Sequence, residues 1–132
     1  MKPMEFRGRW VLVTGASSGL GREMARQLAR DHGANIVAVA RRADRLDALK
    51  QELEPTGVKV LPIVADLQKT EDVDRVCEAT TQGEPLYGAI LNAGIESPFT
   101  LGDDFDPEAY RRAMSINLDG VAFGFHAVRP GL

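Results

Sequence analysis

Short runs of Val, Ile, Leu and Ala alternate with helical segments along the whole chain. Four of these runs are expected to form strands, over residues 10–14, 36–40, 58–65 and 86–91. Nearly continuous apolar strands separated by helices indicate a parallel sheet that helices cover on both faces. Right-handed crossovers favour the strand order 3-2-1-4. The sequence therefore predicts a doubly wound α/β fold, with Pro62 placing the third strand at an edge.

Helical spacing of apolar residues marks the segments between the strands. Residues 20–30 are expected to form a helix that Gly33 ends, and residues 46–53 a second helix that Pro55 ends. A third helix is expected to begin with Thr70 as its N-cap. The residues expected to share an apolar face in these helices are Leu20, Met24, Ala25, Leu28 and Ala29; Leu46, Leu49 and Leu53; and Val73, Val76, Cys77 and Thr80.

A last helix is expected after a loop over residues 95–105. Asp106 is its predicted N-cap and Pro107 its first residue, and the helix should run to about Val128. One face carries large apolar residues, and the opposite face carries Ala113, Asn117, Gly120 and Gly124. The large residues are Tyr110, Met114, Leu118, Val121, Phe125 and Val128. Because glycine costs about 1 kcal/mol relative to alanine inside a helix, Gly120 and Gly124 should serve close packing.

Composition excludes several classes of protein. The 132 residues are enough for one domain, and the single cysteine, Cys77, excludes an internal disulfide or a multi-cysteine metal site. No metal, nucleic acid or membrane is expected as a partner, and the expected location is cytoplasmic. Residues 1–50 hold 10 of the 16 Lys and Arg residues. Within them, Arg22, Arg26 and Arg30 share one helical row that fits a solvated face better than a site.

A glycine-rich turn over residues 14–21, Thr-Gly-Ala-Ser-Ser-Gly-Leu-Gly, joins the first strand to the first helix. Gly15 permits a sharp turn, Gly19 permits close approach of a ligand to the backbone, and Gly21 permits the helix to pack on the strand. Backbone amides and the helix dipole could there bind a pyrophosphate. The alternative is a turn that binds nothing. The sequence lacks the Gly-Lys-Ser/Thr of a phosphate-binding NTPase loop.

Four landmarks follow one another along the chain: Gly15-x-x-x-Gly19-x-Gly21, Asp66-Leu67, Asn92-Ala93-Gly94 and Asn117-Leu118-Asp119-Gly120. Together they resemble the short-chain dehydrogenase/reductase family, whose fold is Rossmann-like. The resemblance implies an oxidoreductase acting on a carbonyl or an alcohol. It implies that Asp66 and Leu67 hold the adenine, that residues 92–94 line the ribose side, and that Asn117 is a catalytic residue. Taken alone, Asp66 could be a strand-end cap and Asn117 an ordinary polar residue of a helix.

The end of the second strand bears on the choice of cofactor. A carboxylate there would bind a free ribose 2′-hydroxyl and repel a 2′-phosphate, but the residue is Ala40, followed by Arg41 and Arg42. With Ser17 as a further donor, this pattern predicts NADP(H) rather than NAD(H). The alternative is that the two arginines are solvated charges. The predicted cofactor-binding residues are Gly15, Ser17, Ser18, Gly19, Leu20, Gly21, Arg41, Asp66, Leu67, Asn92, Ala93 and Gly94.

The catalytic serine, tyrosine and lysine that the resemblance implies are not identifiable. Tyr87 and Tyr110 are the two tyrosines, and neither has a lysine four residues later. The family's two-part dinucleotide site needs a chain roughly twice as long. Residues 1–132 are therefore expected to be one partial dinucleotide-binding domain, truncated after the helix that follows strand four.

Two hypotheses remain open. In the first, the chain is the cofactor-binding part of an NADP(H)-dependent oxidoreductase. In the second, it is a non-catalytic dinucleotide-binding module that forms a homo-oligomer through the exposed edge of strand four. A methyltransferase is a weaker third possibility, because the glycine spacing of this turn differs from that of methyltransferases.

Overall fold

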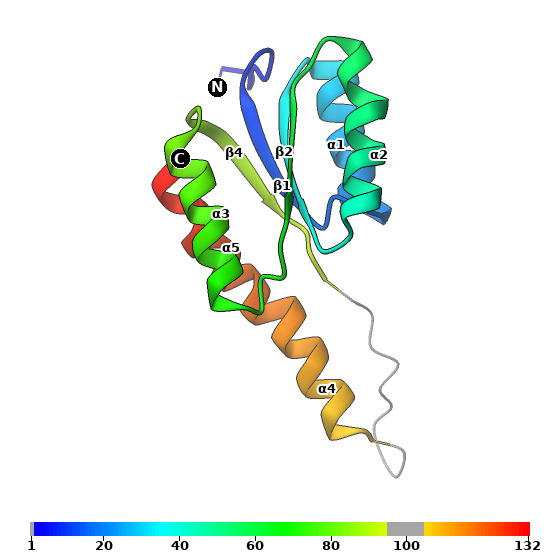
Figure 1. Ribbon diagram of the computed structural model, residues 1–132, viewed down its shortest axis with the longest axis vertical. Coiled ribbons are helices and arrows are strands. Elements are labelled where there is room, and N and C mark those ends of the chain that lie inside the picture. The colour runs from blue at the N-terminus through cyan, green and yellow to red at the C-terminus, as the bar shows by residue number, and fades with distance from the viewer. Residues whose placement is uncertain (1, 95–104) are drawn as a thin grey trace.

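The computed structural model describes residues 2–94 and 105–132 of the chain (Figure 1). Four parallel strands form one sheet in the order β3-β2-β1-β4, as predicted. Their bounds are Trp10–Thr14 for β1, Asn35–Ala40 for β2, Val60–Val64 for β3 and Leu86–Leu91 for β4. β3 is shorter than the predicted 58–65, and it lies at an edge of the sheet, as Pro62 indicated.

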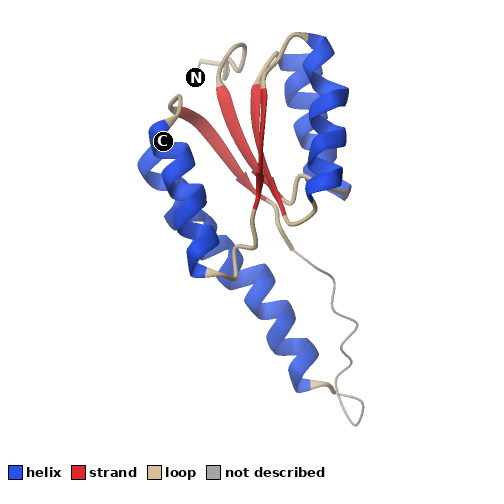
Figure 2. Ribbon diagram, viewed as in Figure 1, coloured by secondary structure: helices blue, strands red, loops and turns tan. Residues whose placement is uncertain are grey.

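Helices cover both faces of the sheet (Figure 2). α1 and α2 lie on one face, α3 and α5 lie on the other, and α4 extends beyond the sheet (Figure 1). Their bounds are Gly19–His32 for α1, Ala43–Leu53 for α2, Thr70–Gln82 for α3, Pro107–Met114 for α4 and Gly120–Val128 for α5. Single 3₁₀ turns cover Glu54–Thr56 and Arg129–Gly131. No helix in residues 2–94 and 105–132 is long and apolar enough to cross a membrane.

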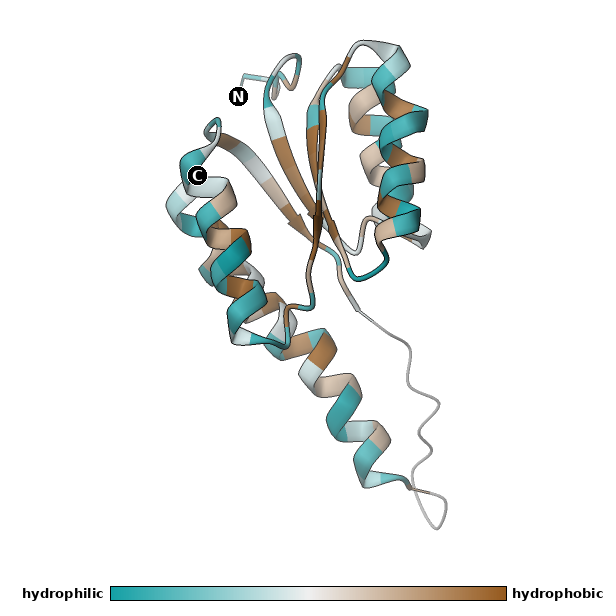
Figure 3. Cartoon of the chain, in the orientation of Figure 1, coloured by the Kyte–Doolittle hydropathy of each residue, from teal (hydrophilic) through white to brown (hydrophobic). Residues whose placement is uncertain are grey.

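Most residues of the strands are hydrophobic, as the brown colouring of Figure 3 shows. In β1, Val11 and Val13 pack into the core beneath α1 and α2. Leu12 points the opposite way, into the core beneath α3 and α5. Because successive side chains of a strand alternate between faces, only an almost wholly apolar strand can bury both sides. This explains why the strands show no polar alternation in the sequence.

Helix boundaries follow most of the predicted signals. Gly33 ends α1 in the left-handed conformation, with φ at 69°, and Asp106 caps α4 by accepting hydrogen bonds from the amides of Glu108 and Ala109. The prediction for Thr70 is wrong, since the helix begins at Thr70 and the cap position belongs to Lys69. The carbonyl of Lys69 accepts the first helical hydrogen bonds, so the helix starts one residue earlier than expected.

The predicted apolar face of α1 is also partly wrong. The buried residues are Gly21, Ala25 and Ala29, whereas Leu20 is 75% exposed. Small residues face the sheet because α1 packs very close to it. Cys77, expected on the buried face of α3, is half-buried.

The last helical segment is interrupted by a π-helical turn over Ser115–Asp119, the π turn, where one continuous α-helix was expected. The small residues Ala113, Gly120, Gly124 and Ala127 are buried, whereas the large apolar face is exposed except for Val128, which is buried. A Cβ atom on Gly124 would lie 3.2 Å from Cδ2 of Leu91, which supplies the packing reason expected for this glycine. Phe125 on the opposite side is 54% exposed.

The side chain of Asn35 joins the amino ends of β1, β2 and β3. Its Nδ2 donates to the carbonyl of Gly8 at 3.3 Å, and its Oδ1 accepts from the amide of Lys59 at 2.9 Å. Asn35 thereby links the segments that lead into β1 and β3 to the start of β2. This end of the sheet is fixed by the chain's own hydrogen bonds.

A charged contact joins α1 to α2. Arg26 donates to both carboxylate oxygens of Glu52, from Nε at 2.6 Å and from an η-nitrogen at 2.7 Å. Arg22 and Arg30 approach the same carboxylate at 3.9 and 3.4 Å. The hydrogen bonds from Arg26 hold the pKa of Glu52 below its ordinary value. The arginine row predicted as a solvated face therefore converges on one acidic residue of the neighbouring helix.

Replacing Glu52 by Gln should lower the free energy of unfolding at neutral pH by about 1 kcal/mol, because a two-pronged contact between partly exposed groups is lost. The folded pKa of Glu52 is lowered, so its contribution is complete above the unfolded pKa of about 4.3 and disappears as pH falls through the folded value. Urea denaturation at pH 7 and in acid measures the difference. Glu23→Gln is the control, since Glu23 contacts Arg26 from the same helix at 3.7 Å. Equal stability losses at both pH values would contradict the assignment.

Candidate functional site

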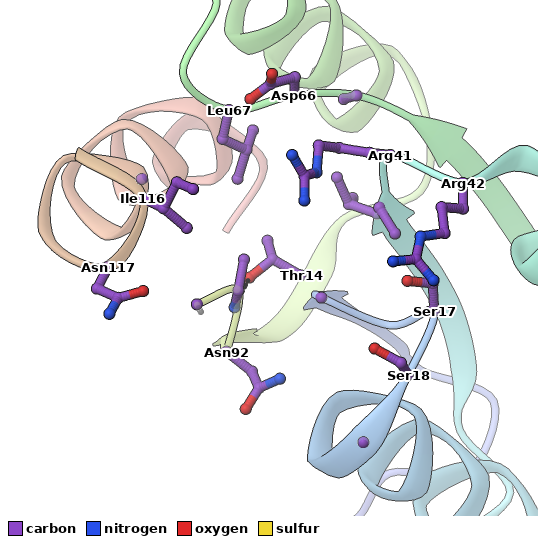
Figure 4. Close-up of a pocket in the computed structure, with 18 of the residues that line it drawn as sticks. Thr14, Ser17, Ser18, Arg41, Arg42, Asp66, Leu67, Asn92, Ile116 and Asn117 are labelled. Atoms are coloured by element: carbon purple, nitrogen blue, oxygen red, sulfur yellow. Dashed lines mark hydrogen bonds between the residues drawn. The ribbon is translucent and has the colours of Figure 1, made fainter. Parts of the chain in front are cut away.

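A pocket of about 560 Å³ lies at the carboxyl ends of all four strands (Figure 4). It lies where the chain order reverses in the sheet, because β1 has β2 on one side and β4 on the other. In open α/β sheets this position is the usual ligand-binding crevice. The pocket is therefore the candidate functional site.

The turn after β1 brings backbone close to the pocket. Gly15 and Gly19 have φ angles of +66° and +57°, which side chains rarely permit. A Cβ atom on Gly21 would lie 2.2 Å from the carbonyl oxygen of Gly15 and 2.6 Å from Nδ2 of Asn92. A Cβ atom on Gly19 would meet nothing within 4 Å, so the space on that side is open. Gly15 and Gly21 thus serve the turn and the packing that the sequence predicted, and close approach of a ligand at Gly19 stays a prediction.

The start of α1 suits an anion. Ser18 occupies the N-cap position and makes no side-chain hydrogen bond to the helix. The first turn of α1, which the structure describes in full, contains no acidic residue. The first amides of a helix have no partner inside the helix, and the dipole favours negative charge at this end. A phosphate group in the pocket would supply acceptors for these amides.

Thr14 fixes the end of β1 against the end of β4. Its buried hydroxyl accepts from the amide of Ala93 at 3.1 Å and lies 3.5 Å from the carbonyl of Ile90, within reach to donate. This contact sets the backbone of residues 92–94, which line the pocket. Thr14 is not among the residues predicted for the site. A hydroxyl at the end of an otherwise apolar strand was the available signal.

The loop after β3 presents Asp66 and Leu67 to the pocket. Oδ1 of Asp66 accepts from the amide of Gln68 at 3.0 Å. One carboxylate oxygen is thus used to shape the loop. Leu67 is buried against Gly124 of α5, and a Cβ atom there would lie 3.6 Å from its Cδ1.

The π turn brings Asn117 and Ile116 to the pocket wall. Oδ1 of Asn117 would lie 3.0 Å from a Cβ atom on Gly94, so the amide group reaches the chain that follows β4. The hydroxyl of Ser115 donates to Oε1 of Gln68 at 3.3 Å, which joins the π turn to the loop after β3. An inserted residue in a helix shifts its face, and such turns often occur at functional sites.

Positive charge borders one side of the pocket. Arg41 and Arg42 follow the buried Ala40 at the end of β2 and line the pocket. In Figure 4 the side chain of Arg42 points toward Ser17, while that of Arg41 points into the pocket. Among the described lining residues, Asp66 is the single acidic one. No group of three or more His, Cys, Asp or Glu residues in the described ranges could hold a metal ion.

The structure brings the predicted residues together at one pocket, with one exception. Gly21 does not line the pocket, and it contacts Gly15 and Asn92 behind the pocket wall. The residues predicted for cofactor binding or catalysis that line it are Gly15, Ser17, Ser18, Gly19, Leu20, Arg41, Asp66, Leu67, Asn92, Ala93, Gly94 and Asn117. Lining residues absent from that prediction include Thr14, Arg42, Gln68, Ile116 and Gly120. Ile116 had no sequence signal, because helical periodicity does not reveal a π turn.

A family comparison agrees with this geometry. The model of the family described as short chain dehydrogenase matches residues 9–132. The chain belongs to the short chain dehydrogenase family. This membership confirms the resemblance drawn from the four landmarks and the Rossmann-like fold.

Similar proteins include reductases and dehydrogenases of this family. A peroxisomal 2,4-dienoyl-CoA reductase of Arabidopsis thaliana is 32% identical over 96% of this chain, and the match covers 42% of the reductase. A structure from Shigella flexneri 2a in complex with NADP is 27% identical, with a TM-score of 0.87 over 97% of this chain and 55% of the other. The structure of NAD⁺-bound xylitol dehydrogenase is 25% identical, with a TM-score of 0.88, and the match covers 97% of this chain and 49% of the dehydrogenase. The chain thus spans about half the length of the relatives it matches.

Replacing Gly21 by Ala should destabilise the chain by about 3 kcal/mol, because the added methyl would overlap the carbonyl of Gly15. Gly19→Ala is the matched control: its methyl has open space, so its cost is backbone strain of about 1 kcal/mol. Chemical denaturation of both variants gives the comparison. Equal losses of stability at the two positions would show that the close contact between Gly15 and Gly21 does not determine the cost of a side chain at residue 21.

Proposed function

We propose that this chain binds NADP(H) in the pocket at the carboxyl ends of the strands. The observation that carries the proposal is the pair Arg41 and Arg42 after Ala40, on a pocket wall whose glycine-rich turn suits a pyrophosphate. A guanidinium group binds phosphate oxygens through paired hydrogen bonds, and no carboxylate at position 40 opposes a 2′-phosphate. The family includes both an NADP complex and an NAD⁺ complex, so the arginines carry the choice between them.

Each part of the dinucleotide has candidate partners on the pocket wall. The open space beside Gly19 and the start of α1 suit the pyrophosphate. Asp66 and Leu67 offer a hydrogen-bond acceptor and an apolar surface for the adenine. Arg42 and Ser17 offer donors to a 2′-phosphate. When bound, the nicotinamide ring would supply the hydride-carrying chemistry of the family.

The contribution of this chain to an oxidoreductase would be cofactor binding and the presentation of Asn117. Neither tyrosine is placed for proton transfer in the pocket. Tyr87 packs edge-on against Phe6 with centroids 5.5 Å apart and lies under Arg9 at 4.4 Å, and Tyr110 packs against Phe105. Neither lines the pocket. We therefore propose dinucleotide binding, without turnover by a tyrosine–lysine route, as the function of these 132 residues.

The choice of cofactor is tested by titrating the chain with NADPH and NADH and following nicotinamide fluorescence. We expect NADPH to bind about 10- to 100-fold more tightly, because each charged hydrogen bond to the 2′-phosphate contributes. Arg42→Gln and Arg41→Gln should each weaken NADPH binding and leave NADH binding nearly unchanged. Arg45→Gln is the control, since Arg45 is exposed on α2 and does not line the pocket. Tighter binding of NADH by the unmodified chain would overturn the NADP(H) assignment.

A second candidate function is a non-catalytic module that self-associates through β4. In the described part of the chain, β4 pairs with β1 alone, and five of its six residues are half-buried. An unpaired strand edge of this kind offers backbone donors and acceptors to a second copy.

Light scattering over a concentration series tests this candidate. Self-association through β4 predicts a molar mass that rises from monomer to dimer with concentration. Hydrogen exchange should then slow at the β4 amides as the dimer forms. A constant monomer mass, or protection confined to other elements, would remove this candidate.

A further inference from the structure

Two side chains of α3 hold the loop that presents Asp66, although neither lines the pocket. Oδ2 of Asp72 accepts from the backbone amide of Asp66 at 2.8 Å. Oδ1 of Asp72 accepts from an η-nitrogen of Arg75 at 2.8 Å, and that nitrogen also donates to the carbonyl of Val64 at 2.6 Å. α3 is therefore tied to the last residue of β3 and to the first acidic residue of the loop.

These contacts engage backbone amide and carbonyl groups that make no hydrogen bond within the sheet. The amide of Ala65 makes the last sheet hydrogen bond, to the carbonyl of Ala40 at 2.9 Å. Beyond it, the carbonyl of Val64 goes to Arg75, the amide of Asp66 goes to Asp72, and the carbonyl of Asp66 accepts from the amide of Lys69 at 2.9 Å. β3 is an edge strand that pairs with β2 alone in the described part of the chain, so no second strand fixes its outer side at this point.

We propose that Asp72 is the positioning residue for the adenine-binding carboxylate of Asp66. Asp72 fixes the Asp66 amide, and Arg75 orients Asp72 by holding its other oxygen. With its backbone fixed and Oδ1 engaged by the amide of Gln68, Asp66 would offer Oδ2 as the acceptor for a ligand in the pocket that it lines. The inference rests on the proposed binding of an adenine dinucleotide.

The chemistry of the base provides a selective readout. A carboxylate only accepts hydrogen bonds, and the exocyclic amino group of adenine donates them. Hypoxanthine has a carbonyl oxygen at that place, which a carboxylate would repel. A well-placed Asp66 should therefore discriminate between adenosine 2′,5′-bisphosphate and inosine 2′,5′-bisphosphate, whereas a general loss of stability would weaken both ligands alike.

The experiment measures the dissociation constants of both bisphosphates by calorimetry for the unmodified chain, Asp72→Ala and Asp72→Asn. Asp72→Ala should weaken the adenosine ligand about tenfold and abolish most of the discrimination, because a charge-assisted hydrogen bond to the loop is lost. Asp72→Asn keeps one acceptor oxygen, so it should retain part of the affinity for the adenosine ligand and part of the discrimination. Asp74→Ala is the matched control, since Asp74 is exposed on the same helix and has the same charge.

A double-mutant comparison separates positioning from a direct effect. If Asp72 acts through Asp66, Asp72→Ala should change adenosine affinity and discrimination far less in an Asp66→Asn background. Additive losses would overturn the proposal, as would unchanged discrimination in Asp72→Ala. If Asp72→Ala does not fold, Asp72→Asn and Arg75→Gln take its place: reduced discrimination in both supports the proposal, and full discrimination in either overturns it.

The two hypotheses fail in different ways. If the unmodified chain binds neither bisphosphate, the proposed function fails. If the unmodified chain binds and discriminates, but Asp72→Ala behaves like Asp74→Ala, the positioning role alone fails.

Discussion

The close crossing of α1 over the turn that follows β1 is the contact on which the rest of the site depends. At Gly21 the helix lies so near the carbonyl of Gly15 that no side chain fits between them. This proximity places the first turn of α1 beside the ends of β1 and β4, and it leaves open space beside Gly19. The packing of α1 and the shape of this side of the pocket are therefore set by one short stretch of backbone, in which each glycine meets a different requirement.

Sequence reasoning predicted the elements whose causes are local. β4 has the predicted bounds, and Gly33 and Asp106 end and begin their helices as expected, because a left-handed residue and a side-chain cap act on neighbouring residues. The pocket could also be predicted, since parallel strands bring their carboxyl ends, and the polar residues that follow them, to one edge of the sheet.

The features that sequence reasoning missed depend on contacts between distant residues. The π turn at Asn117 belongs to a segment that packs through small residues against β4 and α3, and no spacing in the sequence reveals its extra residue. Leu20 was expected in the core because it is apolar, but the crossing at Gly21 leaves it beside the pocket. Asp72 is six residues from Asp66, and only the path of the intervening loop brings its carboxylate to the Asp66 amide.

The amino end of α1 differs from the amino end of α4, and the difference has a thermodynamic consequence. α4 begins with amides that Asp106 satisfies from within the chain, while the cap residue of α1, in the described turn, makes no such side-chain bond. A ligand phosphate at α1 would do for that helix what Asp106 does for α4. Any ligand that binds only the folded state raises its stability by mass action. Ligand occupancy and folding are then linked. The free energy of unfolding of the sheet and its first helix would therefore rise with the concentration of a phosphate-bearing ligand.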